Sequence, residues 1–307
     1  IRDSLNFAWN RLGWPPVERV VGADLDLVHS PHPLIIPARR AKHVITIHDL
    51  FFLKHPEMAS AEIRRDYVDL VRQHAARADG VLCVSEHTAA EARSLLGVAP
   101  EKIAVTPLGV DPEFRESLPE ERIEATLRRL RIPRGAVLYL GSDEKRKNIV
   151  ALVMAYLNMS TRRPSAPPLV LVGPGSGWAQ GGRHVGPQIR ATGYLPRDDV
   201  RALMATSSAL VLPSLEEGFG LPVVEAMAAG LPVICSRGSA LEEVAGDAAT
   251  LVEPGNSSAL AQAIERLLDD PDAAQRQREL GLERSRLFDW RDTATRTLEF
   301  YRTILGR

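Results

Sequence analysis

The stretch at residues 214–230, SLEEGFGLPVVEAMAAG, decides how the second half of this chain folds. The apolar run at 209–214 predicts a buried strand before it, and Pro222 suits an early position in a helix. Gly218 and Gly220 lie between the two, where the lack of a side chain lets backbone N–H groups approach a ligand closely. The sequence therefore predicts a strand, a tight turn and a helix, with a turn suited to a phosphate or a sugar.

Two carboxylates flank this turn. Glu217 lies directly before it, and Glu225 lies early in the expected helix. A glutamate at the start of a helix is commonly no more than a favourable partner of the helix dipole, so Glu225 alone is explained equally well by structure and by binding. Glu217 is harder to explain by structure, because ligands of open parallel sheets bind at the carboxyl ends of the strands.

A charged segment at 141–148, GSDEKRKN, follows the apolar run at 136–141 in the same way. Elsewhere in a chain, three consecutive cations would be explained as an ordinary solvated surface. At a strand end that opens a helix, Arg146 and Lys147 are instead placed to bind an anion together with the N–H groups of the helix. The segment predicts a site for a diphosphate.

Short apolar runs alternate with helical patterns along the whole chain, which is typical of βαβ units and parallel sheets. Strands are expected at 25–29, 44–48, 80–85, 103–107, 136–141, 169–173, 209–214, 232–236 and 249–252. Helices are expected at 61–78, 88–96, 147–157, from about 222, 257–268 and 290–305. A polar, proline-bearing stretch at 111–118 predicts the linker. The expected domains are an α/β domain at 1–115, a second at 116–288 and a closing helix at 289–307.

Composition excludes several classes of protein. Lys and Arg number 38 against 39 Asp and Glu, a net charge of -1, which excludes a broadly cationic surface for nucleic acid. Cys83 and Cys235 lie in apolar runs and predict buried free thiols, as fits a reducing cytoplasm. Every segment of the sequence falls short of the ~20 uncharged apolar residues that a membrane helix needs.

The run from Glu217 to Glu225 resembles the E-x7-E motif of retaining GT-B glycosyltransferases of family 4. The resemblance implies that Glu217 is catalytic and contacts hydroxyls of the donor sugar, and that Glu225 binds the ribose of the nucleotide. A carboxylate suits both roles, because it accepts hydrogen bonds from a diol through two oxygens. The turn between the two glutamates is implied to bind substrate as well, through Gly218, Phe219, Gly220 and Leu221.

The segment GSDEKRKN is similar to the G-[T/S]-x-E-x-R-K-N segment of the same family, in which Arg146 and Lys147 would hold the donor diphosphate. Ser142 is implied to bind substrate as well; some family members carry arginine in its place, so this chain is expected to depend more heavily on Arg146 and Lys147.

Two further segments resemble the family. VITIHDL, at 44–50, is similar to its I-H-D-L segment, which implies that His48 faces the donor sugar from the first domain. Without that match His48 would be explained as a capping or packed histidine. TGYLP, at 192–196, implies contacts of Gly193, Tyr194 and Leu195 with the nucleobase.

The resemblance implies a GT-B fold, in which two Rossmann-like parallel-sheet domains face each other across a cleft. It implies transfer of a hexose from a nucleotide-diphosphate sugar, GDP-mannose as the first expectation, to a hydroxyl of a glycan or lipid-linked acceptor in polysaccharide or glycolipid synthesis. The protein is expected to lie in the cytoplasm, at the inner face of a membrane with which it associates weakly and peripherally. No cofactor and no metal are expected: the D-x-D at 24–26 opens a strand, and His29 and His32 lack further spaced ligands.

Two other classes of function stay open. A glycoside hydrolase also uses paired carboxylates, but it does not need a diphosphate site. A non-catalytic subunit that binds a nucleotide sugar would share every motif and transfer nothing.

The first domain is expected to be incomplete. The family's first domain opens with a strand, a glycine-bearing loop and a helix before the strand that LDLVH resembles, and here that strand arrives by residue 25. Two βαβ-sized steps, roughly 60–90 residues, are expected to precede it. The chain as given is then expected to bind nucleotide, to transfer sugar poorly and to aggregate.

Overall fold

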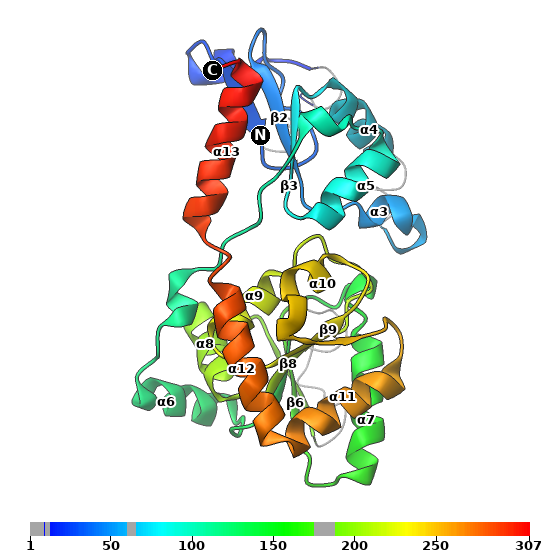
Figure 1. The fold of residues 1–307 in the computed structure, drawn as a ribbon, viewed down its shortest axis with the longest axis vertical. Coiled ribbons are helices and arrows are strands. Elements are labelled where there is room, and N and C mark those ends of the chain that lie inside the picture. The colour runs from blue at the N-terminus through cyan, green and yellow to red at the C-terminus, as the bar shows by residue number, and fades with distance from the viewer. Residues whose placement is uncertain (1–8, 10–12, 60–65, 175–187) are drawn as a thin grey trace. The chain divides into compact units, whose positions relative to one another are not determined.

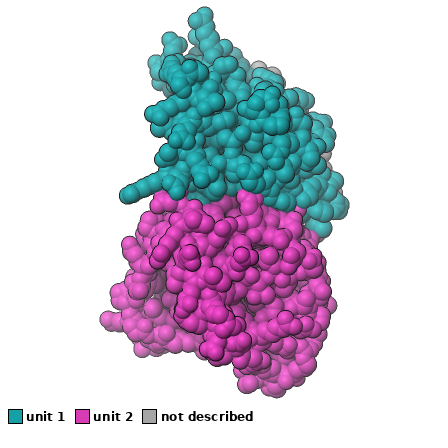
Figure 2. Space-filling model, viewed as in Figure 1, with its two compact units in different colours: residues 1–109, 290–307 teal, residues 110–289 magenta. Residues whose placement is uncertain are grey.

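The computed structural model describes residues 9, 13–59, 66–174 and 188–307. It divides the chain into two compact units, residues 1–109 with 290–307 and residues 110–289 (Figure 2). The stretch expected as the linker, 111–118, lies inside the second unit, because Phe114 is buried there and Arg115 donates a 2.9 Å hydrogen bond to the carbonyl of Ser285. The two units meet along the chain at Gly109–Val110 and at Asp289–Trp290.

The first unit contains a four-stranded parallel sheet in the order β1-β2-β3-β4. Its strands are β1 (Leu27–Ser30), β2 (Lys42–Ile47), β3 (Gly80–Cys83) and β4 (Ile103–Val105). Its helices are α2 (Val17–Val21), α3 (Phe51–Lys54), α4 (Val68–Arg77), α5 (Glu86–Leu96) and α13 (Trp290–Leu305). The four strands match those expected from the apolar runs; part of the helix expected at 61–78 lies outside the described residues.

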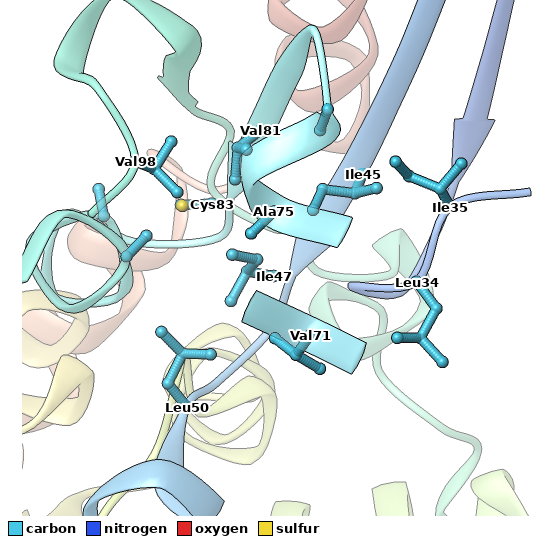
Figure 3. Packing of buried hydrophobic residues seen from close by; sticks show 13 residues of the cluster. Leu34, Ile35, Ile45, Ile47, Leu50, Val71, Ala75, Val81, Cys83 and Val98 are labelled. Atoms are coloured by element: carbon cyan, nitrogen blue, oxygen red, sulfur yellow. The ribbon is translucent and has the colours of Figure 1, made fainter. Parts of the chain in front are cut away.

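Both faces of this sheet are buried, so the side chains that alternate along a strand enter two different parts of the core. Ile45 and Ile47 of β2 point to one face, where they pack with Val71 of α4 (Figure 3). Val44 of β2 points to the other face, where it belongs to a cluster with Phe300 of α13.

The closing helix α13 is therefore part of the first unit, although it ends the chain, and it lies along β2 (Figure 1). Gly80 opens β3 directly beneath it: a Cβ at Gly80 would lie 2.7 Å from the ring of Phe300, so only glycine allows this approach. The hydroxyl of Tyr301 lies 2.5 Å from Nδ1 of His29 in β1. Contacts on three strands fix the position of the helix.

We expect Phe300→Ala to destabilise the first unit by about 3 kcal/mol or more, because it leaves a cavity between α13 and the sheet. Leu298→Ala is the control on the same helix, since Leu298 is 49% exposed and its loss should change stability by no more than about 0.5 kcal/mol. Hydrogen exchange followed by mass spectrometry should show faster exchange in β2 and β3 for Phe300→Ala alone, with residues 110–289 unchanged. Equal exchange in the two variants would contradict this packing.

The second unit contains a six-stranded parallel sheet in the order β10-β9-β8-β5-β6-β7. Its strands are β5 (Val137–Leu140), β6 (Leu169–Val172), β7 (Ile189–Gly193), β8 (Ala209–Leu212), β9 (Val233–Ser236) and β10 (Thr250–Val252). All but β7 were expected. β7 escapes a search for apolar runs because it is an edge strand of sequence IRATG, and only Ile189 in it is buried.

Helices connect these strands: α6 (Glu120–Leu130), α7 (Ile149–Arg162), α8 (Arg197–Thr206), α9 (Leu221–Ala228), α10 (Ala240–Ala245), α11 (Ser257–Asp269) and α12 (Pro271–Ser285). The sequence predicts α7, α9 and α11, and it does not predict α6, α8, α10 or α12. In the described part of the chain, every helix is too short or too polar to cross a membrane.

The order of strands locates the edge of the second unit's sheet at which a ligand is expected. From β5 the chain runs to β6 and β7 on one side, and it then returns to β8 on the other side of β5. Connections that leave neighbouring strands in opposite directions open a crevice at their carboxyl ends, where ligands of such sheets bind. The two loops at this point are 141–148 after β5 and 213–220 after β8, the segments that carry the expected binding residues.

Candidate active site

Two hydrogen bonds join the loops at the ends of β5 and β8. The N–H of Leu215 donates to the carbonyl of Arg146 at 2.7 Å, and the side-chain amide of Asn148 donates to the carbonyl of Pro213 at 3.2 Å. Asn148 has a left-handed backbone, with φ of 54°, which asparagine tolerates better than most residues. These contacts hold the basic segment against the glutamate-bearing turn.

The carboxylate of Glu217 is the centre of the site. Its Oε1 accepts hydrogen bonds from Nζ of Lys147 at 2.6 Å and from Oγ of Ser214 at 2.8 Å, and its Oε2 accepts from Nη1 of Arg146 at 3.0 Å. The Glu217 side chain is only 8% exposed, and a buried carboxylate is tolerated only when it is paired and hydrogen-bonded. The structure thus brings together three of the residues expected from the sequence.

A second carboxylate, Glu144, orients Arg146 from the other side. Its Oε2 accepts from Nε of Arg146 at 2.9 Å, and its Oε1 accepts from Oγ of Ser142 at 2.7 Å. Burial raises the pKa of Glu144, but the hydrogen bond from Ser142 and the charge of Arg146 outweigh burial and hold the pKa below its ordinary value. Glu144 therefore stays charged near neutral pH. Sequence reasoning missed Glu144 as a site residue, although it lies two residues before Arg146; it also missed Ser214.

The turn before α9 depends on Gly220. Its φ is +96°, and a Cβ would lie 2.4 Å from the side chain of Leu241, so another residue would be both strained and obstructed. Gly220 caps α9 without a side-chain hydrogen bond, as far as the described residues show, and Leu221 begins the helix. Phe219 and Gly218 are buried, with the ring of Phe219 packed edge-on against Phe288. Any contact of these two with a ligand is therefore expected through their backbones.

Glu225 is the fifth residue of α9, half-buried, and has a different environment from Glu217. Burial raises its pKa; the positive charge of Arg197 lowers the pKa and the negative charge of Asp111 raises it. Arg197 itself is ion-paired with Asp111, which limits its effect on Glu225. The surroundings of Glu225 therefore disfavour its charged form, which is common for residues of binding and catalytic sites.

We expect Glu225→Gln to raise the thermal midpoint of the unliganded protein near neutral pH. The pKa of Glu225 is higher in the fold than in the unfolded chain, so its charged form costs stability above the folded pKa and costs none below the unfolded value. The advantage of the variant should therefore shrink as the pH falls through the raised pKa. Thermal unfolding of both proteins across this range measures it; a midpoint that falls at every pH would show that the charge of Glu225 is stabilising.

Three other residues that were expected to bind the nucleotide lie at the end of β7. Gly193 ends β7 with φ of +71°, Tyr194 after it is 81% exposed, and the side chain of Leu195 is buried. They lie at the carboxyl end of β7, and Tyr194 is the one whose side chain is open to a ligand.

In the first unit, His48 is exposed just after β2, with Nε2 3.1 Å from the carbonyl oxygen of Pro31. It therefore lies at the carboxyl end of its own sheet. The residues that mimic metal motifs have other partners: Asp26 pairs with Arg307 at 3.2 Å, and His29 bonds Thr46 at 2.7 Å.

Comparisons with known proteins identify the family of this chain. The sequence profile described as "Glycosyl transferases group 1" matches residues 129–284, and that described as "Glycosyltransferase Family 4" matches residues 4–114. The chain is 31% identical to "O-antigen chain mannosyltransferase B" of Escherichia coli over 91% of this chain and 74% of that protein. It is also 31% identical to "MMP alpha-(1->4)-mannosyltransferase" of Mycolicibacterium hassiacum, over 80% of this chain and 59% of that protein. Among solved structures, HepE of Anabaena in complex with UDP-glucose resembles it with a TM-score of 0.70 at 20% identity, over 87% of this chain and 73% of that one.

Proposed function

Because this chain belongs to the glycosyl transferases group 1, and is thus a hexosyltransferase with the two parallel-sheet domains of the GT-B fold, we propose that its second unit binds a nucleotide-diphosphate sugar whose hexose it transfers to a hydroxyl acceptor. The observation that carries the proposal is the cluster of Arg146 and Lys147 on Glu217 at the carboxyl ends of β5 and β8. It supplies cations for a diphosphate beside a carboxylate for a sugar.

Each residue of the cluster has a part in the proposed chemistry. As the bond from the sugar to the diphosphate breaks, negative charge accumulates on the leaving diphosphate. Arg146 and Lys147 stabilise that charge from fixed positions, with no metal ion required. Glu217 accepts hydrogen bonds from the sugar, and Glu225 accepts them from the ribose. The incoming hydroxyl attacks from the face that the diphosphate leaves and gives its proton to the departing diphosphate oxygen, so the configuration at the sugar is retained.

The donor we propose first is GDP-mannose, because two relatives are named mannosyltransferases. The proposed acceptor is a growing glycan or a lipid-linked sugar, since one relative is named for the O-antigen chain, and such an acceptor would place the reaction at the cytoplasmic face of a membrane. HepE binds UDP-glucose with the same fold, so GDP, UDP, ADP and dTDP sugars belong in one thermal-shift screen. The sugar nucleotide that raises the midpoint most is the donor, since a ligand that binds only the folded state stabilises it.

Lys147→Ala should weaken binding of the donor and of the free nucleoside diphosphate by at least about tenfold. It removes one charge-assisted contact to phosphate, worth about 1.5–3 kcal/mol. Lys145→Ala is the matched control, because Lys145 carries the same charge two positions earlier and its side chain is exposed. Calorimetry should show the loss for Lys147→Ala alone, and EDTA should change neither affinity nor turnover. Equal affinities in the two variants would show that the basic segment is an ordinary solvated surface and not a diphosphate site.

Glu217→Gln should lower turnover far more than it changes nucleotide affinity, because the carboxylate is proposed to act on the sugar. Donor turnover and nucleoside-diphosphate binding are measured on the same preparation. A loss of turnover below about threefold, less than 1 kcal/mol of transition-state stabilisation, removes Glu217 from the catalytic role.

The same assays separate the alternative functions. A non-catalytic subunit would bind the nucleotide tightly and transfer to no acceptor. A glycoside hydrolase would turn over glycosides without a nucleotide, and Lys147→Ala would not affect it.

A further inference from the structure

Tyr139 is a polar residue in the apolar strand β5, VLYL, and its hydroxyl makes a hydrogen bond to the loop that follows the strand. The side chain is only 1% exposed, which makes it one of the largest buried groups of the protein. Its hydroxyl donates a 2.8 Å hydrogen bond to the carbonyl of Ser142. A buried tyrosine hydroxyl needs such a partner, and here the partner belongs to the basic loop.

The chain after β5 lies directly over this hydroxyl. A Cβ at Gly141 would lie 2.7 Å from the Tyr139 oxygen, and a Cβ at Gly173 would lie 2.0 Å from the carbonyl of Gly141. Two glycines are thus needed for the ends of β5 and β6 to approach each other and the tyrosine. Because of this packing, the start of the loop rests on the Tyr139 hydroxyl.

A continuous chain of hydrogen bonds leads from Tyr139 to Glu217. Ser142, whose carbonyl accepts from Tyr139 at 2.8 Å, donates through Oγ to Glu144 at 2.7 Å. Glu144 accepts from Nε of Arg146 at 2.9 Å, and Nη1 of Arg146 donates to Glu217 at 3.0 Å. Each link fixes the next, so the direction of the Arg146 guanidinium depends on where Ser142 is held.

We propose that Tyr139 is a positioning residue of the donor site: its hydroxyl holds Ser142 so that Glu144 aims Arg146 at the diphosphate. The inference rests on the proposed function, because it assumes that Arg146 binds a diphosphate. Tyr139 does not touch the donor, and it acts through the backbone of Ser142 and the carboxylate of Glu144.

The electrostatic setting keeps this hydroxyl a donor. Burial raises the pKa of Tyr139, and the negative charges of Glu217 and Glu144 raise it further, against the opposing charge of Arg146. The hydroxyl therefore keeps its proton across the working range of pH.

The test compares Tyr139→Phe with Tyr156→Phe. Tyr156 is a matched control, because it is also buried in the second unit and its hydroxyl also donates to a backbone carbonyl, that of Pro167 at 2.6 Å. Both variants lose one such bond, so similar losses of stability are expected. Affinities for GDP, UDP, ADP and dTDP, and for the four matching nucleosides without phosphate, are measured by calorimetry or by competition.

Tyr139→Phe is expected to lower the affinity for the nucleoside diphosphate that wild type binds by about threefold to tenfold, the range set by one net hydrogen bond. The affinity for the matching nucleoside should stay unchanged. Tyr156→Phe should change neither affinity. In a Glu144→Gln background, Tyr139→Phe should cost nothing more, because both act through the same chain of hydrogen bonds.

The outcomes separate the inference from the proposed function. Wild type that binds none of GDP, UDP, ADP and dTDP contradicts the proposed function and the inference with it. Wild type that binds, with Tyr139→Phe equal to Tyr156→Phe, contradicts the inference alone. A Tyr139→Phe effect that remains complete in the Glu144→Gln background contradicts the route through Glu144.

Discussion

A buried carboxylate with two cations on it is the interaction on which the second unit depends. Glu217 is nearly withdrawn from solvent, and Arg146, Lys147 and Ser214 supply the hydrogen bonds that make this burial tolerable. Removing one partner of such a group leaves an unpaired buried charge, which is far more costly than any exposed ion pair is favourable. The two loops that carry these residues are therefore fixed relative to each other by the charge at their junction.

The parallel sheet makes this junction possible. β5 and β8 are neighbours, but the chain between them passes through β6, β7 and α8, so some seventy residues separate the basic segment from Glu217. Both strands end at the same edge, and their connections diverge, which leaves room for a ligand at the point where the charges meet. In the proposed function, a diphosphate that enters there would compete with Glu217 for the two cations and leave the carboxylate free to accept hydrogen bonds from the sugar. Phosphate binding and sugar binding would then be coupled through this one group.

The sequence predicts most of the strands and the charged residues of this arrangement, but not the residues that position them. Apolar runs locate nine of the ten described strands because buried parallel strands are apolar on both faces, and the polar edge strand β7 is missed for the same reason. Glu217, Arg146 and Lys147 can be singled out because each lies at a strand end beside glycines or a helix start. Glu144, Ser214 and Tyr139 cannot, since their roles depend on contacts made after the sheet forms. The side chain of Phe219 packs on Phe288 rather than opening to a ligand, and a local pattern does not predict that either.

The most direct test of this account is a double-mutant cycle between Lys147 and Glu217, read out as affinity for the nucleoside diphosphate that wild type binds. Lys147→Met, Glu217→Gln and the double variant are compared with wild type by calorimetry at one salt concentration. If the carboxylate and the diphosphate share the same cation, the cost of losing Lys147 should differ between the two Glu217 backgrounds by about fivefold or more, roughly 1 kcal/mol. Costs that agree within about 0.5 kcal/mol would show that the two groups act independently, and that the ion cluster does not couple the phosphate to the sugar.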